Sequence, residues 1–62
     1  MYTRAIYDIQ ELQFVMNQLV DRKVSFSFNP GVSTTISVWY IDVAEWHTVL
    51  LNDLMKQAFD LR

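Results

Sequence analysis

Two pairs of carboxylates are the residues whose type and spacing could do chemistry. Asp8 and Glu11 lie three residues apart, and Asp42 and Glu45 repeat that spacing later in the chain. Carboxylates that converge in a cleft can act as a general acid and a general base. The same spacing is typical of a helix start, where the aspartate accepts hydrogen bonds from first-turn N–H groups. We interpret both pairs as helix caps and predict no catalytic residue.

Two other features invite a chemical interpretation, and both have a simpler one. His47 could be a general base, but no recognisable motif places a Ser, Cys or Asp partner beside it, so we expect a partly buried or interface histidine. Asn29-Pro30-Gly31 contains one glycine, whereas phosphate-binding loops need several, and we predict a turn. The chain has no cysteine and one histidine, so we expect no metal and no cofactor.

Charge and hydropathy exclude several classes of partner. The formal net charge is −2, and the five basic residues are scattered, which argues against a nucleic-acid or anionic-membrane surface. No apolar run has membrane-spanning length, and the N-terminus lacks a signal-peptide pattern, so we expect a cytoplasmic protein. No feature points to a small-molecule substrate.

Helical periodicity marks two segments. The first runs from Asp8 to about Arg22, and its apolar stripe is Ile9, Leu12, Val15, Met16, Leu19 and Val20, with Phe14 opposite. The second runs from Asp42 to about Asp60. Its predicted core stripe is Val43, Trp46, Leu50, Leu54, Ala58 and Leu61. A second apolar row on the same helix consists of Leu51, Met55 and Phe59.

Alternating residues predict a hairpin between the helices. Val24, Phe26 and Phe28 alternate with serines, and the segment 34–41 is β-branched and aromatic. We expect Ile36, Val38 and Tyr40 to face the core with the phenylalanines. That parity places Trp39 and Ile41 on the other side of the sheet.

The first seven residues decide the fold. By analogy with the second carboxylate pair, Thr3 to Tyr7 should be a strand that leads into Asp8. Residues 1–62 then form a single α+β domain, β-α-β-β-α, with two helices on one face of a two- to three-stranded antiparallel sheet in the order 1-3-2. The alternative is α-β-β-α, in which these residues extend the first helix.

The aromatic content suggests a function based on contact with protein. Two tryptophans, three tyrosines and four phenylalanines exceed what so short a chain can bury easily. We therefore predict a non-enzymatic interaction protein that forms a homodimer. The alternatives are a regulatory inhibitor or adaptor of a larger host protein, as in phage accessory proteins, and single-stranded nucleic-acid binding through the Trp39 face. The candidate interface residues are Tyr7, Trp39, Ile41, Leu51, Met55 and Phe59. The strand from Val24 to Phe28 is a further candidate, since it lacks the lysine or bulge that protects an edge.

Overall fold

A computed structural model describes residues 1–31 and 37–61. Its elements are β1 (Tyr2–Ile6), α1 (Ile9–Asp21), β2 (Phe26–Pro30), β3 (Trp39–Val43), the 3-10 turn η1 (Glu45–His47) and α2 (Thr48–Asp60). The predicted β-α-β-β-α order is confirmed, and the alternative without a first strand is wrong. The predicted turn residues Asn29 and Pro30 belong to β2, because both pair with β3.

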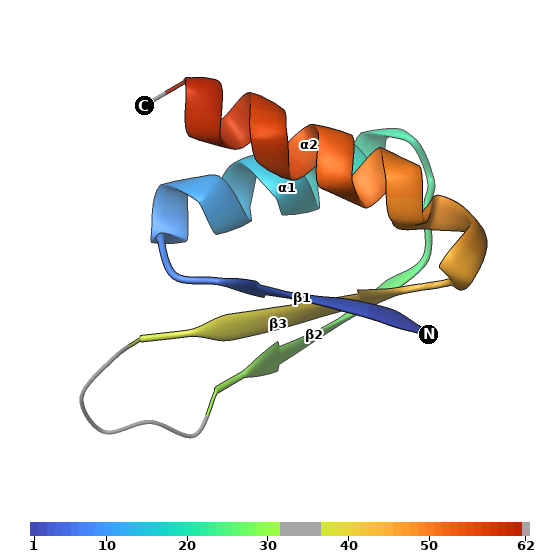
Figure 1. Cartoon of the computed structure of the whole chain (residues 1–62), viewed down its shortest axis with the longest axis horizontal. Helices are drawn as coiled ribbons and strands as arrows, with labels where there is room; N and C mark the ends of the chain where they lie inside the picture. The colour runs from blue at the N-terminus through green and yellow to red at the C-terminus, as the bar shows by residue number, and fades with distance from the viewer. Residues whose placement is uncertain (32–36, 62) are drawn as a thin grey trace.

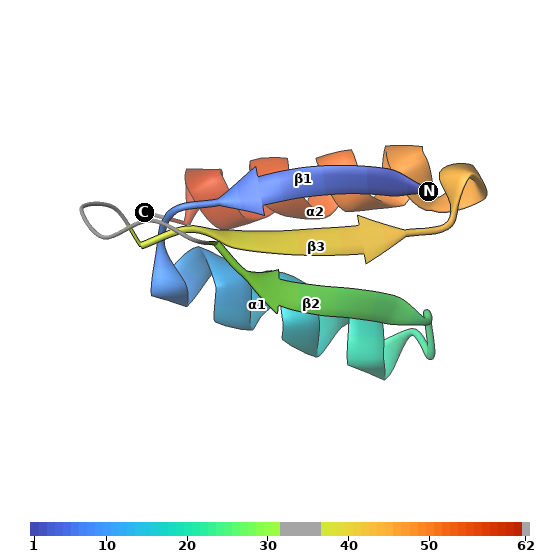
Figure 2. The same ribbon diagram turned by 90° about the horizontal axis from the view of Figure 1, so that it is seen from below.

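The sheet has β3 at its centre, antiparallel to both neighbours, in the predicted order β1-β3-β2. Both helices cover the same face of this sheet (Figure 1). Seen from the other face, α2 lies behind β1 and α1 lies behind β2 (Figure 2). The described residues therefore form two layers and leave one face of the sheet uncovered.

Asp8 of the first carboxylate pair caps α1 as predicted. The Asp8 carboxylate accepts hydrogen bonds from the backbone N–H groups of Gln10 and Glu11, at 2.7 and 3.1 Å. These bonds satisfy two donors that the first turn of a helix leaves without an intrahelical acceptor. The cap also sets the direction in which the chain leaves β1 and enters the helix layer.

The second carboxylate pair does not cap a helix, so that prediction is wrong. Asp42 lies inside β3, where its carboxylate accepts from Thr3 Oγ1 of β1 and from Asn29 Nδ2 of β2 at 3.4 Å. The helical segment begins later, with η1, and α2 proper starts at Thr48, whose Oγ1 donates to the Glu45 carbonyl at 2.6 Å. Donors from neighbouring strands thus replace the first-turn N–H groups as partners of Asp42.

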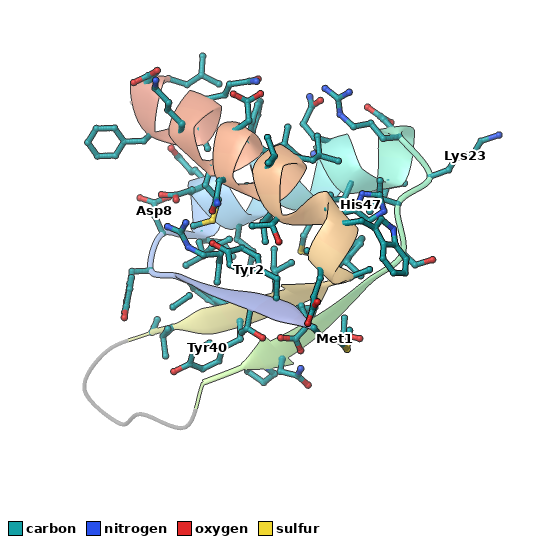
Figure 3. All side chains as sticks on the ribbon, turned by 45° about the vertical axis from the view of Figure 1, so that its right-hand side comes forward. Met1, Tyr2, Asp8, Lys23, Tyr40 and His47 are labelled. Carbon is teal, nitrogen blue, oxygen red and sulfur yellow. The ribbon has the colours of Figure 1, made fainter. Side chains whose placement is uncertain are left out.

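The predicted faces are reversed for β3, whereas Phe26 of β2 packs against the core as predicted. Ile41 and Val43 are fully buried under the helices, and Trp39 packs against the same core. Tyr40 is on the opposite, open face, 39% exposed (Figure 3). Strand alternation therefore has the opposite parity to the one predicted. Ile36, which was expected in the core row, lies outside the described residues.

The helices contribute a core that differs in part from the predicted stripes. The buried hydrophobic residues are Ile6, Leu12, Val15, Leu19, Ile41, Val43, Leu51, Leu54, Met55 and Ala58. Trp46 is 83% exposed and Leu61 is also exposed. Trp46 lies on η1 and Leu61 caps the end of α2, so neither lies on the buried side of that helix, which carries Leu51, Leu54, Met55 and Ala58. Phe14, expected on the solvent side of α1, is half-buried and packs against the core.

The C-terminus of α1 closes with a Schellman motif that brings the chain back to the sheet. The N–H of Lys23 donates to the Val20 carbonyl, and the N–H of Val24 donates to the Leu19 carbonyl, both at 3.0 Å. This geometry requires a left-handed residue, and Lys23 adopts it with φ of 57°. A residue with a Cβ pays about 1 kcal/mol for that conformation, which glycine adopts freely.

We predict that Lys23→Gly raises the free energy of unfolding by about 0.5–1 kcal/mol, because it relieves the left-handed strain. The control is Arg22→Gly, at a residue with φ of −87°, where glycine brings only added freedom in the unfolded chain and should lower stability. Urea unfolding at a fixed protein concentration measures both variants. A loss of stability in Lys23→Gly would contradict the assignment of this cap.

Candidate protein-interaction surface

The predicted interface residues do not form one surface. Ile41, Leu51 and Met55 belong to the core, and Trp39 packs against it from the helix-covered face, so these side chains do not provide the surface predicted for them. Tyr7 and Phe59 are exposed. They follow β1 and end α2, respectively, at the same end of the molecule (Figure 1).

The two edge strands differ in which backbone groups they direct away from the sheet. The N–H of Gly31 donates to the Val38 carbonyl at 2.6 Å, which continues the β2–β3 register by one pair. In an antiparallel ladder, hydrogen-bonded pairs alternate with non-hydrogen-bonded ones. Ser27 and Asn29 therefore bond toward β3, and the outward backbone groups of β2 belong to Phe26, Phe28 and Pro30. The same alternation directs the backbone groups of Thr3 and Ala5 outward from β1.

Polar side chains occupy the helix-facing side of β1. The Tyr2 hydroxyl donates to Asn52 Oδ1 at 2.8 Å, and the Arg4 guanidinium donates to the same oxygen. In Figure 3, Tyr2 lies between β1 and the helices. An inward-pointing charge on an edge strand discourages another strand from pairing there, so Arg4 protects the β1 edge.

The helix-facing side of β2 carries no charged residue like Arg4 of β1. The strand reads Phe-Ser-Phe-Asn-Pro, and the register places Phe26 and Phe28 on the helix-covered face, opposite Val43 and Ile41. Phe28 remains 41% exposed although it lies on that face. Pro30 has no N–H. It is tolerated in β2 because its backbone nitrogen points away from β3, so the β2–β3 ladder loses no hydrogen bond. Within the described residues, β2 pairs with β3 alone and keeps a free edge.

An apolar flank of α1 accompanies this free edge. Ile9, Met16 and Val20 are spaced by seven and four residues, so they share one side of the helix, next to the buried stripe. Ile9 is 49% exposed and Val20 is 61% exposed. In Figure 2, α1 runs from left to right with α2 above it and the sheet in front. Right-handed winding then places this flank on the side away from α2, beyond β2.

These parts make one surface, which we call the β2–α1 edge. It consists of the outward backbone of β2 together with Phe26, Phe28, Ile9, Met16 and Val20. None of these side chains is charged, and the surface joins unpaired strand hydrogen-bonding groups to exposed apolar side chains. Both properties are typical of a strand edge that pairs with another chain. The sequence signal for it was the lack of a lysine or a bulge in this strand.

The described residues offer little for other kinds of chemistry. They form no pocket and contain no group of three His, Cys, Asp or Glu residues that could hold a metal ion. Within the same residues, no helix has the length and hydropathy needed to span a membrane. His47 is half-buried, as predicted, with its ring centroid 6.0 Å from that of Trp46.

The comparisons with known proteins return no match. No protein-family model fits the chain, and neither a curated protein nor a solved structure is similar to it.

We predict that Arg4→Gln raises the pKa of Tyr2. The hydrogen bond from Arg4 lowers that pKa below its ordinary value of 10.0, desolvation opposes this shift, and the positive charge of Arg4 adds to the lowering. A lowered pKa contributes stability that is fully present above the ordinary pKa of 10.0 and is lost as the pH falls through the folded-state pKa. Tyr2 is therefore a neutral hydrogen-bond donor at pH 7, where its lowered pKa contributes nothing to the free energy of unfolding.

Phenolate absorbance measured during a pH titration tests this prediction, with Tyr2→Phe as the variant that identifies the Tyr2 signal. The Tyr2 signal should appear at higher pH in Arg4→Gln than in the unaltered protein. An unchanged titration would contradict the hydrogen bond between Arg4 and Tyr2 in solution.

Proposed function

We propose that this protein acts by protein–protein contact, without catalysis, and that it self-associates as a homodimer through the β2–α1 edge. The observation that carries the proposal is the coincidence of a free strand edge with an uncharged apolar helix flank. Apolar contacts and paired backbone groups would both be gained there.

The small size of the chain supports association with a partner. A 62-residue domain buries only about 60% of the surface that its unfolded chain exposes, so its stability margin is small. The chain has no disulfide to compensate, because it contains no cysteine. Association with a second folded copy adds buried apolar area without added chain length.

A dimer also fits the available surface. The accessible surface of the described chain is 4412 Å². A standard interface buries about 800 Å² per partner, which is roughly a fifth of that area. One five-residue strand cannot supply so much area, and the α1 flank provides an adjoining apolar contact.

The cytoplasm is the compartment we propose. A small domain without cysteine gains nothing from an oxidising compartment, where disulfides stabilise domains of this size.

We predict that Phe28→Lys shifts the protein from dimer to monomer. A lysine on an edge strand opposes strand pairing, and its aliphatic stem can still cover the apolar surface beneath it. Size-exclusion chromatography with light scattering at micromolar concentration measures the mass. The dissociation constant should rise by at least tenfold, with the circular dichroism spectrum retained.

The matched control is Trp46→Lys, which changes a more exposed aromatic residue on η1, outside the β2–α1 edge. It should leave the dimer intact. A monomeric unaltered protein at micromolar concentration would refute self-association. A dimer that is broken by Trp46→Lys and not by Phe28→Lys would place the interface elsewhere.

A further inference from the structure

We propose that the two copies pair β2 with β2 in antiparallel orientation, so that the dimer has one continuous six-stranded sheet with all four helices on the same face. This inference rests on the proposed self-association and adds the way in which the two chains meet.

The backbone of β2 is complementary to itself. Phe26 and Phe28 each direct one N–H donor and one C=O acceptor outward, so a second copy of the strand offers the groups that the first one lacks. The pairing cannot extend far in either direction. Pro30 has no N–H, and the N–H of Val24 already donates to the Leu19 carbonyl at 3.0 Å. The two phenylalanines are therefore the centre of the seam.

Antiparallel pairing keeps paired side chains on the same face of the sheet. The phenylalanines of both copies then lie on the helix-covered face, where aromatic pairs form across the seam. A two-fold axis perpendicular to the sheet also places the α1 helices on either side of the seam in antiparallel orientation. Their facing flanks carry Ile9, Gln13, Met16 and Val20, which are uncharged, so no like charges meet.

A second copy suits this surface better than an unrelated extended peptide. A peptide can satisfy the strand edge, but it leaves Ile9 and Val20, 49% and 61% exposed, without an apolar partner. A second copy supplies a strand and a helix flank together. The other edge does not support such pairing, because Arg4 lies on the helix-facing side of β1 and binds Asn52.

Cysteine cross-linking tests the pairing directly, since the chain has no cysteine of its own. Ser27 is exposed and lies between the two phenylalanines, with its side chain on the open face. In the proposed dimer the two copies of residue 27 lie within about two strand spacings, roughly 10 Å, of each other. The Ser27→Cys variant should cross-link efficiently with a bismaleimide of that reach.

The matched control is Thr3→Cys, which is also exposed and on the open face, but on the outer strand β1. Its two copies would be separated by about five strand spacings, roughly 24 Å, and should not cross-link. Asn29→Cys, two residues along β2 on the same face, is a second reporter in case Ser27→Cys fails to fold. Its two copies would lie roughly 14 Å apart, so it is tested with a bismaleimide of that longer reach.

The outcomes separate the two proposals. Cross-linking of Ser27→Cys at least tenfold faster than that of Thr3→Cys supports the β2 seam. A dimer in which neither β2 variant cross-links, or in which only Thr3→Cys does, overturns the seam and leaves self-association standing. An unaltered protein that is monomeric by light scattering overturns both.

Discussion

A sheet of three strands has to support two helices on one face, and much of the structure depends on that mismatch of width. Three strands spaced by about 4.8 Å make a layer roughly 14 Å wide, whereas two packed helices occupy about 20 Å. The core is closed where the helices meet the central strand, around Ile41 and Val43. At the two sides, the helix layer extends beyond the sheet and keeps exposed apolar residues, such as Val20 on α1 and Phe59 on α2. The two sides differ in that β1 carries Arg4 toward its helix and β2 carries only uncharged residues.

The order of elements could be predicted because its signals are local. Asp8 bonds to residues two and three positions away, so sequence spacing is sufficient to identify the cap. Asp42 has the same local pattern, but its partners Thr3 and Asn29 come from two other strands, and only the assembled sheet reveals them. The prediction of the buried face of β3 was wrong for a related reason. Both side-chain rows of β3 contain aromatic and β-branched residues, so hydropathy alone cannot determine which row faces the helices. Pairing of β3 with β1 and β2 determines it.

The interaction surface could be predicted only in part. The sequence shows that β2 lacks protective charges, but whether Phe28, Ile9 and Val20 are exposed on the same side of the molecule depends on how α1 crosses the sheet. Leu51 and Met55 were predicted to form a spare apolar row of α2 together with Phe59. The predicted core stripe was anchored on Val43 and Trp46, but α2 starts at Thr48 and contains neither residue. Its buried side therefore carries Leu51 and Met55, while Phe59 stays exposed. A helix boundary shifted by a few residues therefore changed the apparent interface.

The most direct test of the account follows the backbone amides of the two edge strands by nuclear magnetic resonance while the protein is diluted. If β2 pairs with β2, the N–H groups of Phe26 and Phe28 exchange slowly with solvent in the dimer and lose that protection on dilution. The outward N–H groups of Thr3 and Ala5 should exchange rapidly at every concentration. Fast, concentration-independent exchange at Phe26 and Phe28 in a sample that remains dimeric would contradict pairing at the free edge of β2.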